Sequence, residues 1–165
     1  MIVGALVALL AASALGAPGP AAWTNALPAA TRTILEEAER LELFSLDPIP
    51  PRHAVTNGFH GWIILGATTV TNAQGQKELT AAFEKGVEEN KGMSAYCFKP
   101  QHGIRATKGK KTIDFVICFH CLQVLIFEDH IEQGSVLITA SPQPTFDKIL
   151  RDAHVPLFSL REPPE

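Results

Sequence analysis

The amino-acid sequence predicts an α+β domain in which three helices pack on one face of a mostly antiparallel sheet of about five strands. Two observations support this class. Segments rich in β-branched and aromatic residues follow one another between residues 93 and 139 and are separated by short polar turns. Segments with helical spacing of apolar residues lie before and after that region. Strands grouped in this way favour hairpins over a parallel, doubly wound sheet.

The first helix is expected to begin at Thr31 and to reach about Leu43. Apolar residues recur there at spacings of three and four, and charged residues occupy the opposite side. Three prolines follow within residues 47–57. Because proline disfavours both helices and central strands, this segment is expected to be a surface loop.

A strand and a second helix are expected next. Residues 59–70 are rich in β-branched and aromatic side chains, with Gly61 or Gly66 marking a bend or bulge. The second helix follows the turn at residues 72–75 and ends at residues 90–92, which read Asn-Lys-Gly. Its apolar stripe consists of Leu79, Ala82, Phe83, Gly86 and Val87.

Two hairpins and a last helix complete the domain. The predicted strands cover residues 104–107, 112–117, 124–127 and 135–139. The first pair flanks the polar turn at residues 108–111, and the second flanks a polar stretch that ends at Gly134. Ser141 and Pro142 predict the start of the last helix, and residues 155–158 are expected to form a short edge strand.

The composition limits the classes of function. The 165 residues have the length of one domain, and the 46% of hydrophobic residues is typical of a folded protein rather than a linker. The net charge of −3 lacks the basic excess of nucleic-acid-binding proteins, so no nucleic-acid partner is expected. Three cysteines are too few for a disulfide-rich scaffold.

The N-terminus resembles a secretory signal peptide. Residues 2–17 have only apolar and small side chains, residues 12–14 offer an Ala-Ser-Ala cleavage site, and no Lys or Arg precedes them. A retained membrane anchor and an N-terminal core helix are the alternatives. We expect an exported protein, periplasmic or secreted, with no stable membrane span after cleavage. The predicted divisions are a signal peptide and the start of a linker at 1–22, a flexible linker at 23–30, one α+β domain at 31–160 and a frayed tail at 161–165.

One stretch is too long to be a single strand. Residues 113–127 are strand-like almost throughout, and fully extended they would span about 50 Å, roughly three times an ordinary strand. The chain must therefore turn within this stretch, and the sequence Cys118-Phe-His-Cys121 lies near its middle. Because these residues form turns poorly, a bound metal or a Cys118–Cys121 linkage is expected to hold the turn.

The cysteines and one histidine have the spacing of a metal site. Cys97, His102, Cys118 and Cys121 form the pattern C-x4-H-x15-C-x2-C, in which two short ligand pairs are separated by the length of a hairpin. Thiolates and imidazole are ligands of tetrahedral zinc, so the leading hypothesis is a non-enzymatic domain with a structural zinc site. In a regular strand Cys118 and Cys121 point to opposite faces, which makes His120 an alternate ligand.

Other interpretations of the same residues remain open. A disulfide from Cys97 to Cys118 or to Cys121 would make the domain a stabilised binding module of the cell envelope, with a protein partner there. Inert buried cysteines are a second alternative. A Cys-dependent enzyme is a third, because Asp114, Cys118 and His120 would share a strand face. No catalytic signature surrounds any of them. The remaining histidines lack partners at ligand spacing and are expected to be surface or structural residues: His53, His60, His130 and His154.

Four segments together resemble a family of uncharacterised bacterial proteins, often exported, that share a CFxPRH…CFxC pattern. The segments are Leu43-Phe-Ser-Leu-Asp-Pro48, Phe59-His-Gly-Trp-Ile-Ile-Leu-Gly66, Cys97-Phe-Lys-Pro-Gln-His-Gly-Ile-Arg105 and Ile117-Cys-Phe-His-Cys121. The resemblance covers residues 35–158. Gln101 stands where the family pattern has Arg. The resemblance implies an exported location and directs attention to the same cysteines and histidine, and it implies no activity.

Overall fold

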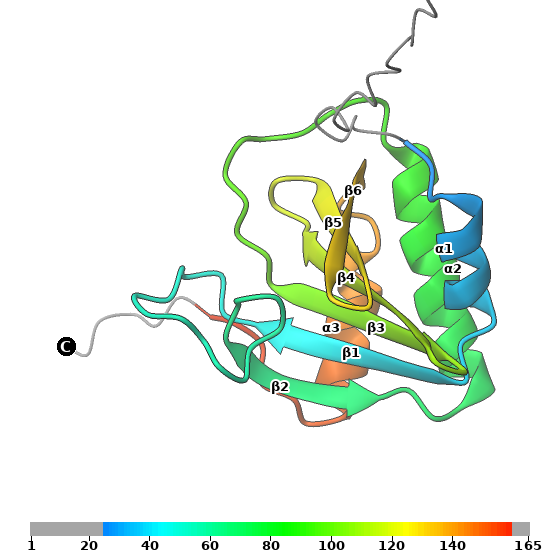
Figure 1. The fold of residues 1–165 in the computed structure, drawn as a ribbon, viewed down its shortest axis with the longest axis horizontal. Helices are drawn as coiled ribbons and strands as arrows, with labels where there is room; N and C mark the ends of the chain where they lie inside the picture. Colours follow the sequence, from blue (N-terminus) through cyan, green and yellow to red (C-terminus); the bar gives the residue numbers. More distant parts are fainter. Residues whose placement is uncertain (1–24, 160–165) are drawn as a thin grey trace, which may run out of the picture.

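The computed structural model describes residues 25–159, so the predicted signal peptide at 1–22 and the predicted tail at 161–165 lie outside the described residues. Along the chain the elements are α1 (Ala29–Glu36), β1 (Arg40–Leu46), β2 (Ile64–Thr69), α2 (Ala73–Glu89), β3 (His102–Lys108), β4 (Lys111–Cys118), β5 (Gln123–Glu128), β6 (Ile131–Leu137) and α3 (Gln143–Asp152) (Figure 1). Among the described residues, no helix combines the length and the apolar character that crossing a bilayer requires.

The predicted α+β class is confirmed. The strands form one sheet in the order β2-β1-β3-β4-β5-β6, and every neighbouring pair is antiparallel. The sheet has six strands instead of about five. The additional strand is β1, which lies between β2 and β3 near one end of the sheet.

The prediction of one helix from Thr31 to Leu43 is correct only for its first half. α1 ends at Glu36, and β1 begins at Arg40. Leu41 and Leu43 are buried under the helices, and Leu43 is followed by residues buried on the opposite face of the sheet. A short strand buried on both faces is continuously apolar, so its pattern cannot be told from that of a helix. The linker expected at 23–30 also ends early, since Leu27 is buried and α1 starts at Ala29.

The second half of the chain follows the prediction closely. The β3–β4 hairpin turns at Gly109 and Lys110, and α2 begins after Asn72, whose side chain accepts a hydrogen bond from the Gly75 N–H. The β5–β6 hairpin turns earlier than expected, at residues 129–130, whereas Gly134 lies inside β6. Residues 155–158 form no strand.

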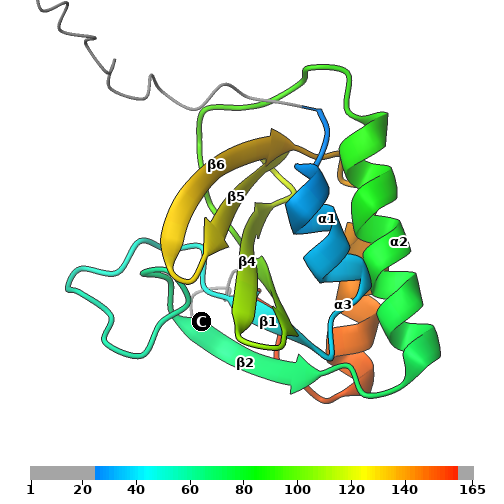
Figure 2. The same cartoon turned by 45° about the vertical axis from the view of Figure 1, so that its right-hand side comes forward.

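The two faces of the sheet are covered by different kinds of structure. All three helices pack on one face, which we call the helix face, and the segments 47–63 and 90–101 cover the other, which we call the loop face (Figure 2). The helix face holds the main apolar core, centred on residues such as Phe83, Phe115 and Phe146. The loop face has a smaller cluster of Phe44, Leu46, Phe59 and Val116, against which Trp62, Ile64, Phe98, Leu125 and Phe127 pack.

Gly103 allows a loop to lie directly on the sheet. It pairs with Phe44 across β1 and β3, and the ring of Phe59 covers it while stacking on Phe44 at a centroid distance of 4.4 Å. A Cβ atom at position 103 would lie 2.5 Å from the Phe59 ring, which is closer than side-chain carbons approach. The absence of a side chain at Gly103 therefore sets the height of Phe59 above the loop face.

Candidate functional site

The sharp turn that the long strand requires is present, and a disulfide closes it. β4 ends at Cys118, residues 119–122 form the turn, and β5 starts at Gln123. Cys118 and Cys121 are joined by a disulfide with a Cα–Cα distance of 5.4 Å, and both are fully buried. The prediction that a Cys118–Cys121 linkage could hold this turn is confirmed.

Cys97 lies beside this disulfide but is not part of it. Its thiol is free and exposed. Its carbonyl oxygen lies 3.9 Å from the Cys118 sulfur. The chain on both sides of Cys97 is held at the turn, because the Ala95 N–H donates to the Cys121 carbonyl at 3.0 Å and the Lys99 N–H donates to the Cys118 sulfur at 3.4 Å. The three cysteines therefore meet at one end of β4.

His102 does not join them. It pairs with Ile117 across β3 and β4, and directly opposed residues share a face, so its side chain lies on the helix face. Cys118, the next residue of β4, points to the loop face. His102 Nε2 is hydrogen-bonded to Asp147 Oδ1 at 2.8 Å, and only 2% of the His102 side chain is exposed. One ion held by the four predicted ligands would require a different backbone arrangement.

The alternate ligand His120 is exposed in the turn itself and lies between the two disulfide cysteines. The alternate ligand set with His120 also includes His102, whose side chain lies on the opposite face of the sheet from Cys118. The residues considered for a Cys-dependent enzyme are likewise apart. The Cys118 sulfur is in the disulfide, and Asp114 is paired with other side chains.

Ser45 lies opposite His102 on β1, so Ser45, His102 and Asp147 gather the residue types of a hydrolase triad on the helix face. Ser45 is fully buried, and neither its Oγ nor His102 Nδ1 has a hydrogen-bond partner among the described residues. Because both side chains are closed to solvent, a substrate has no direct approach to this group.

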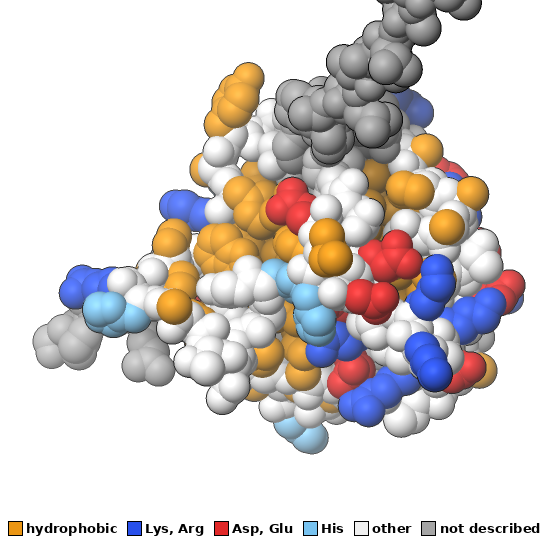
Figure 3. All heavy atoms as spheres, in the orientation of Figure 1, with side chains coloured by type: hydrophobic (Ala, Val, Ile, Leu, Met, Phe, Trp, Pro, Cys, Tyr) orange, Lys and Arg blue, Asp and Glu red, His pale blue; other side chains and the backbone are white. Residues whose placement is uncertain are grey.

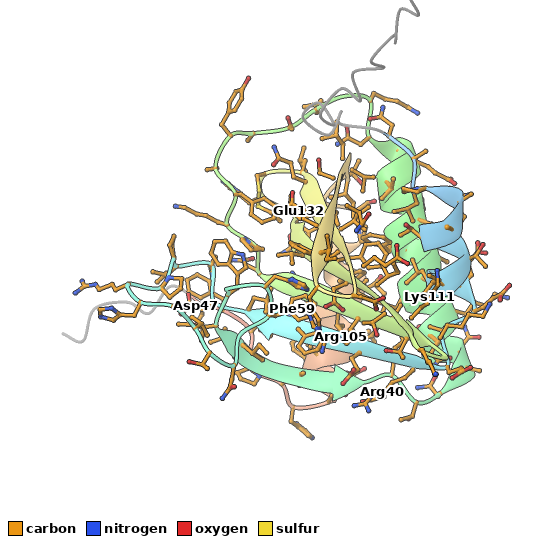
Figure 4. The ribbon with its side chains drawn as sticks, in the orientation of Figure 1. Arg40, Asp47, Phe59, Arg105, Lys111 and Glu132 are labelled. Atoms are coloured by element: carbon orange, nitrogen blue, oxygen red, sulfur yellow. A yellow bond between two sulfur atoms is a disulfide. The ribbon has the colours of Figure 1, made fainter. Side chains whose placement is uncertain are left out.

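The loop face carries a different polar cluster, built on Asp114 in the middle of β4. Arg105 lies directly opposite Asp114 on β3 and donates to both of its oxygens, from Nε at 2.8 Å and from Nη2 at 2.7 Å. His60 Nε2 is 2.7 Å from Asp114 Oδ2. Figure 4 shows Arg105 on this face next to Phe59, whose ring centroid is 5.4 Å from the guanidinium carbon.

The surroundings of Asp114 keep it ionised. Burial by itself raises the pKa of Asp114, but hydrogen bonds from Arg105 and His60, and the charges of both groups, outweigh burial and lower the pKa below its ordinary value. The same hydrogen bond raises the pKa of Arg105 in spite of partial burial. A buried carboxylate therefore faces His60 at neutral pH.

Two tight turns bring histidines to this carboxylate. His60 and Gly61 have φ values of +50° and +86° and form a turn closed by hydrogen bonds between the backbones of Phe59 and Trp62. Asp129 and His130 have φ values of +47° and +71° and form the β5–β6 turn. Left-handed conformations are uncommon for residues other than glycine and cluster at sites where the surrounding structure holds them.

His60, Asp114 and His130 converge on one point. One ligand atom from each of the three lies within 4.8 Å of the other two. Asp114 is buried at the base, the His60 ring stacks on Phe127 at 3.8 Å, and His130 is exposed. In the surface view, histidine side chains near the middle of this face lie between hydrophobic side chains on one side and charged ones on the other (Figure 3).

The sequence interpretation missed this cluster because its members are distant along the chain. His60 and Asp114 are separated by 54 positions, and no short motif contains both. Two signals were present. Asp114 interrupts an otherwise apolar strand, and a charged residue in such a strand needs a partner. The turn at Gly109 and Lys110 also fixes the register that places Arg105 opposite Asp114.

Comparisons of this chain with protein-family models, with curated proteins and with solved structures find no match. The resemblance seen in the Cys-Phe pattern therefore stays a prediction, and the geometry alone carries the functional argument.

Proposed function

We propose that this domain binds one divalent transition-metal ion, with zinc as the leading candidate, through His60, Asp114 and His130. The observation that carries the proposal is the convergence of two imidazoles and one buried carboxylate within 4.8 Å. These donor types suit zinc and other first-row metals. Three protein ligands with one exposed member leave a further coordination position for water.

The role that we propose for the ion is structural. His60 belongs to the loop 47–63, Asp114 to β4 and His130 to the β5–β6 turn, so a bound ion would connect three segments that the helices do not cover. Arg105 fixes the orientation of the carboxylate, as outer-shell partners of metal ligands commonly do. Its positive charge opposes a cation at the same place, so the affinity should be moderate.

Metal titration of untagged protein tests the proposal. After chelation and dialysis, zinc is expected to bind with one equivalent in calorimetry and to raise the thermal midpoint. His60→Ala and His130→Ala should each weaken binding by at least about tenfold, on the scale seen when partners of metal ligands are removed. His154→Ala is the matched control, since His154 is also exposed and also has a positive φ, of +57°.

A second arm separates this site from one formed by the cysteines. Alkylation of all thiols after reduction should leave zinc binding at the histidines unchanged. If alkylation abolished zinc binding while His130→Ala still bound zinc, the ion would be held by Cys97, Cys118 and Cys121, and the proposal would be rejected.

We also propose that the domain works outside the cytoplasm. The Cys118–Cys121 disulfide supports this location, because such bonds persist in oxidising compartments. The same bond supports the alternative role of a disulfide-stabilised binding module of the cell envelope. Expression with and without residues 1–22 in a bacterial host, followed by osmotic-shock fractionation, tests the location. Periplasmic protein is expected only from the longer chain, and cytoplasmic protein from both would oppose export.

A further inference from the structure

We propose a second site, independent of the metal cluster, at which Cys97 exchanges with the Cys118–Cys121 disulfide and makes it accessible to low-molecular-weight thiols. The juxtaposition of one exposed thiol with one buried disulfide carries this inference. The expected activity is reversible thiol–disulfide exchange, with Cys97 as the residue that meets the external thiol.

The backbone holds Cys97 at the disulfide. Hydrogen bonds from Ala95 to the Cys121 carbonyl and from Lys99 to the Cys118 sulfur tether the chain two residues before and two residues after it. A carbonyl oxygen lies about 2.4 Å from its own Cα, so the 3.9 Å contact with the Cys97 oxygen places the Cys97 Cα about 6 Å or less from the Cys118 sulfur. The sulfur of a cysteine lies about 2.8 Å from its own Cα, so turning the Cys97 side chain inward, with a small adjustment of the loop, brings its sulfur to that of Cys118.

Further upstream, the same segment is anchored by Asn90, which is buried. Its amide donates to the carbonyls of Met93 and Ile138, and its side-chain oxygen accepts from the N–H groups of Gly92 and Met93. The Gln123 side chain donates to the Ala95 carbonyl at 2.8 Å. The segment thus has no regular secondary structure but has a defined path past the turn.

Access explains why Cys97 is needed. Cys118 and Cys121 are both fully buried, so an external thiol cannot reach either sulfur in this conformation. Cys97 is exposed and is already part of the molecule, and an attached reactant acts at an effective concentration on the order of millimolar or above. An internal thiol can therefore outcompete a dilute external one for the first attack.

The exchange is balanced without an oxidant. The Cys97 thiolate forms a bond to the Cys118 sulfur, the Cys118–Cys121 bond breaks, and Cys121 leaves as a thiolate that takes up the proton Cys97 released to solvent. The new Cys97–Cys118 disulfide includes the residue on the exposed segment. An external thiol attacks Cys97, forming a mixed disulfide and releasing Cys118 as a thiolate. A second external thiol then frees Cys97 and leaves as the oxidised small molecule.

The environment of Cys118 favours its release as a thiolate when the external thiol attacks Cys97. Its sulfur accepts two backbone hydrogen bonds, from Lys99 at 3.4 Å and from Cys121 at 3.1 Å. Hydrogen bonds to a thiolate stabilise it, and a stabilised thiolate is a better leaving group. Among the described residues, no backbone N–H donates to the Cys121 sulfur in this way. These donors assist the second step, in which Cys118 leaves, whereas proximity to Cys97 is what makes Cys118 the sulfur attacked in the first step.

Reduction kinetics test the proposal on the folded, oxidised protein. With glutathione as the thiol, Cys97→Ser should slow reduction of the Cys118–Cys121 disulfide by at least about tenfold. A variant that combines Cys97→Ser with Tyr96→Cys is the matched control, because it keeps an exposed thiol in the same segment one position away. It should be as slow as Cys97→Ser. Rates within twofold of the wild type in Cys97→Ser would overturn the proposal.

A trapping experiment on the wild type needs no variant. When the oxidised, folded protein is treated with iodoacetamide, peptide mapping should find slow labelling of Cys121, in molecules that carry a Cys97–Cys118 disulfide, next to rapid labelling of Cys97. Cys121→Ser should accumulate a Cys97–Cys118 disulfide under mild oxidation. Labelling confined to Cys97, together with two persistent free thiols in folded Cys121→Ser, would also overturn the proposal.

Discussion

The two faces of the sheet differ in what covers them and in what they bury. The helix face is apolar over most of its area, and its buried histidine, His102, is hydrogen-bonded to Asp147. The apolar cluster on the loop face is smaller, and this face also holds the partly exposed Arg105 and the buried Asp114 and Cys118. Alternation along β3 and β4 produces this difference, since neighbouring residues point to opposite faces.

The difference indicates a division of tasks. Helices bury large side chains and leave few polar groups in need of partners, which suits the helix face to stability. Loops supply turns with unusual backbone conformations, and these carry His60 and His130 to the carboxylate of Asp114. Binding residues are often found on loops that a rigid scaffold holds in place.

The largest expected effect distinguishes the two faces by stability. Phe115 is fully buried on the helix face and packs edge-on against Phe83 at 4.9 Å, so Phe115→Ala should lower the free energy of unfolding by about 3–5 kcal/mol. Phe127 is half-buried on the loop face, and Phe127→Ala should cost about 1–2 kcal/mol. Urea denaturation measures both. Equal losses would show that the loop face contributes as much to stability as the helix face.

The next effect concerns the buried ion pair on the loop face. Asp114→Asn leaves the Arg105 guanidinium without its counter-charge and should lower the free energy of unfolding at pH 7 by about 2–3 kcal/mol. This value is below that of a fully buried pair because 29% of the Arg105 side chain is exposed. Asp152→Asn, which affects an exposed ion pair with Lys148, is the control and should change little. A loss as small as that of the control would contradict the assigned role.

Reduction of the disulfide should have a smaller effect. The Cys118–Cys121 bond closes a loop of only a few residues, so the chain-entropy contribution is about 2 kcal/mol. Urea midpoints with and without reductant measure it, with Cys97→Ser expected to match the wild type in the oxidised state. No change on reduction would mean that hydrogen bonds alone hold the turn at residues 119–122.

The smallest expected effect is the dependence of stability on pH that the ionisation of Asp114 produces. Its pKa is lower in the folded protein than the ordinary value of 3.8, so the unfolded chain takes up the proton first as the pH falls. The stability that Asp114 contributes is complete above that value and is lost as the pH drops through the folded pKa. Carboxyl groups titrate between about pH 5 and pH 2. Over this range the midpoint of thermal unfolding should therefore depend more steeply on pH in the wild type than in Asp114→Asn. Parallel curves would contradict this.

Much of the fold follows from local patterns, and most of the candidate site does not. The apolar stripe from Leu79 to Val87 predicts α2, and the polar turn at residues 108–111 predicts the β3–β4 hairpin. Tertiary packing does not change either of these local preferences. The helix predicted to reach Leu43 overlaps the first half of β1, because burial on both faces removes the alternation that marks a strand.

The cysteine turn shows what chain geometry can and cannot predict. The length of residues 113–127 required a turn near Cys118, which the structure has. The partner of His102 could not be predicted, because Asp147 lies on a helix whose position depends on packing across the whole sheet. The meeting of His60 with His130 likewise depends on two turns that no local rule relates.

Gly103 has a consequence for how chains related to this one should be recognised. Any side chain there would act as a wedge that lifts Phe59, and the turn that follows Phe59 carries His60 towards Asp114. A distant sequence can retain both histidines and the aspartate and still lack the cluster if its equivalent of Gly103 is larger. The His60–Asp114–His130 arrangement therefore depends on a position without a side chain at Gly103 as well as on its three members.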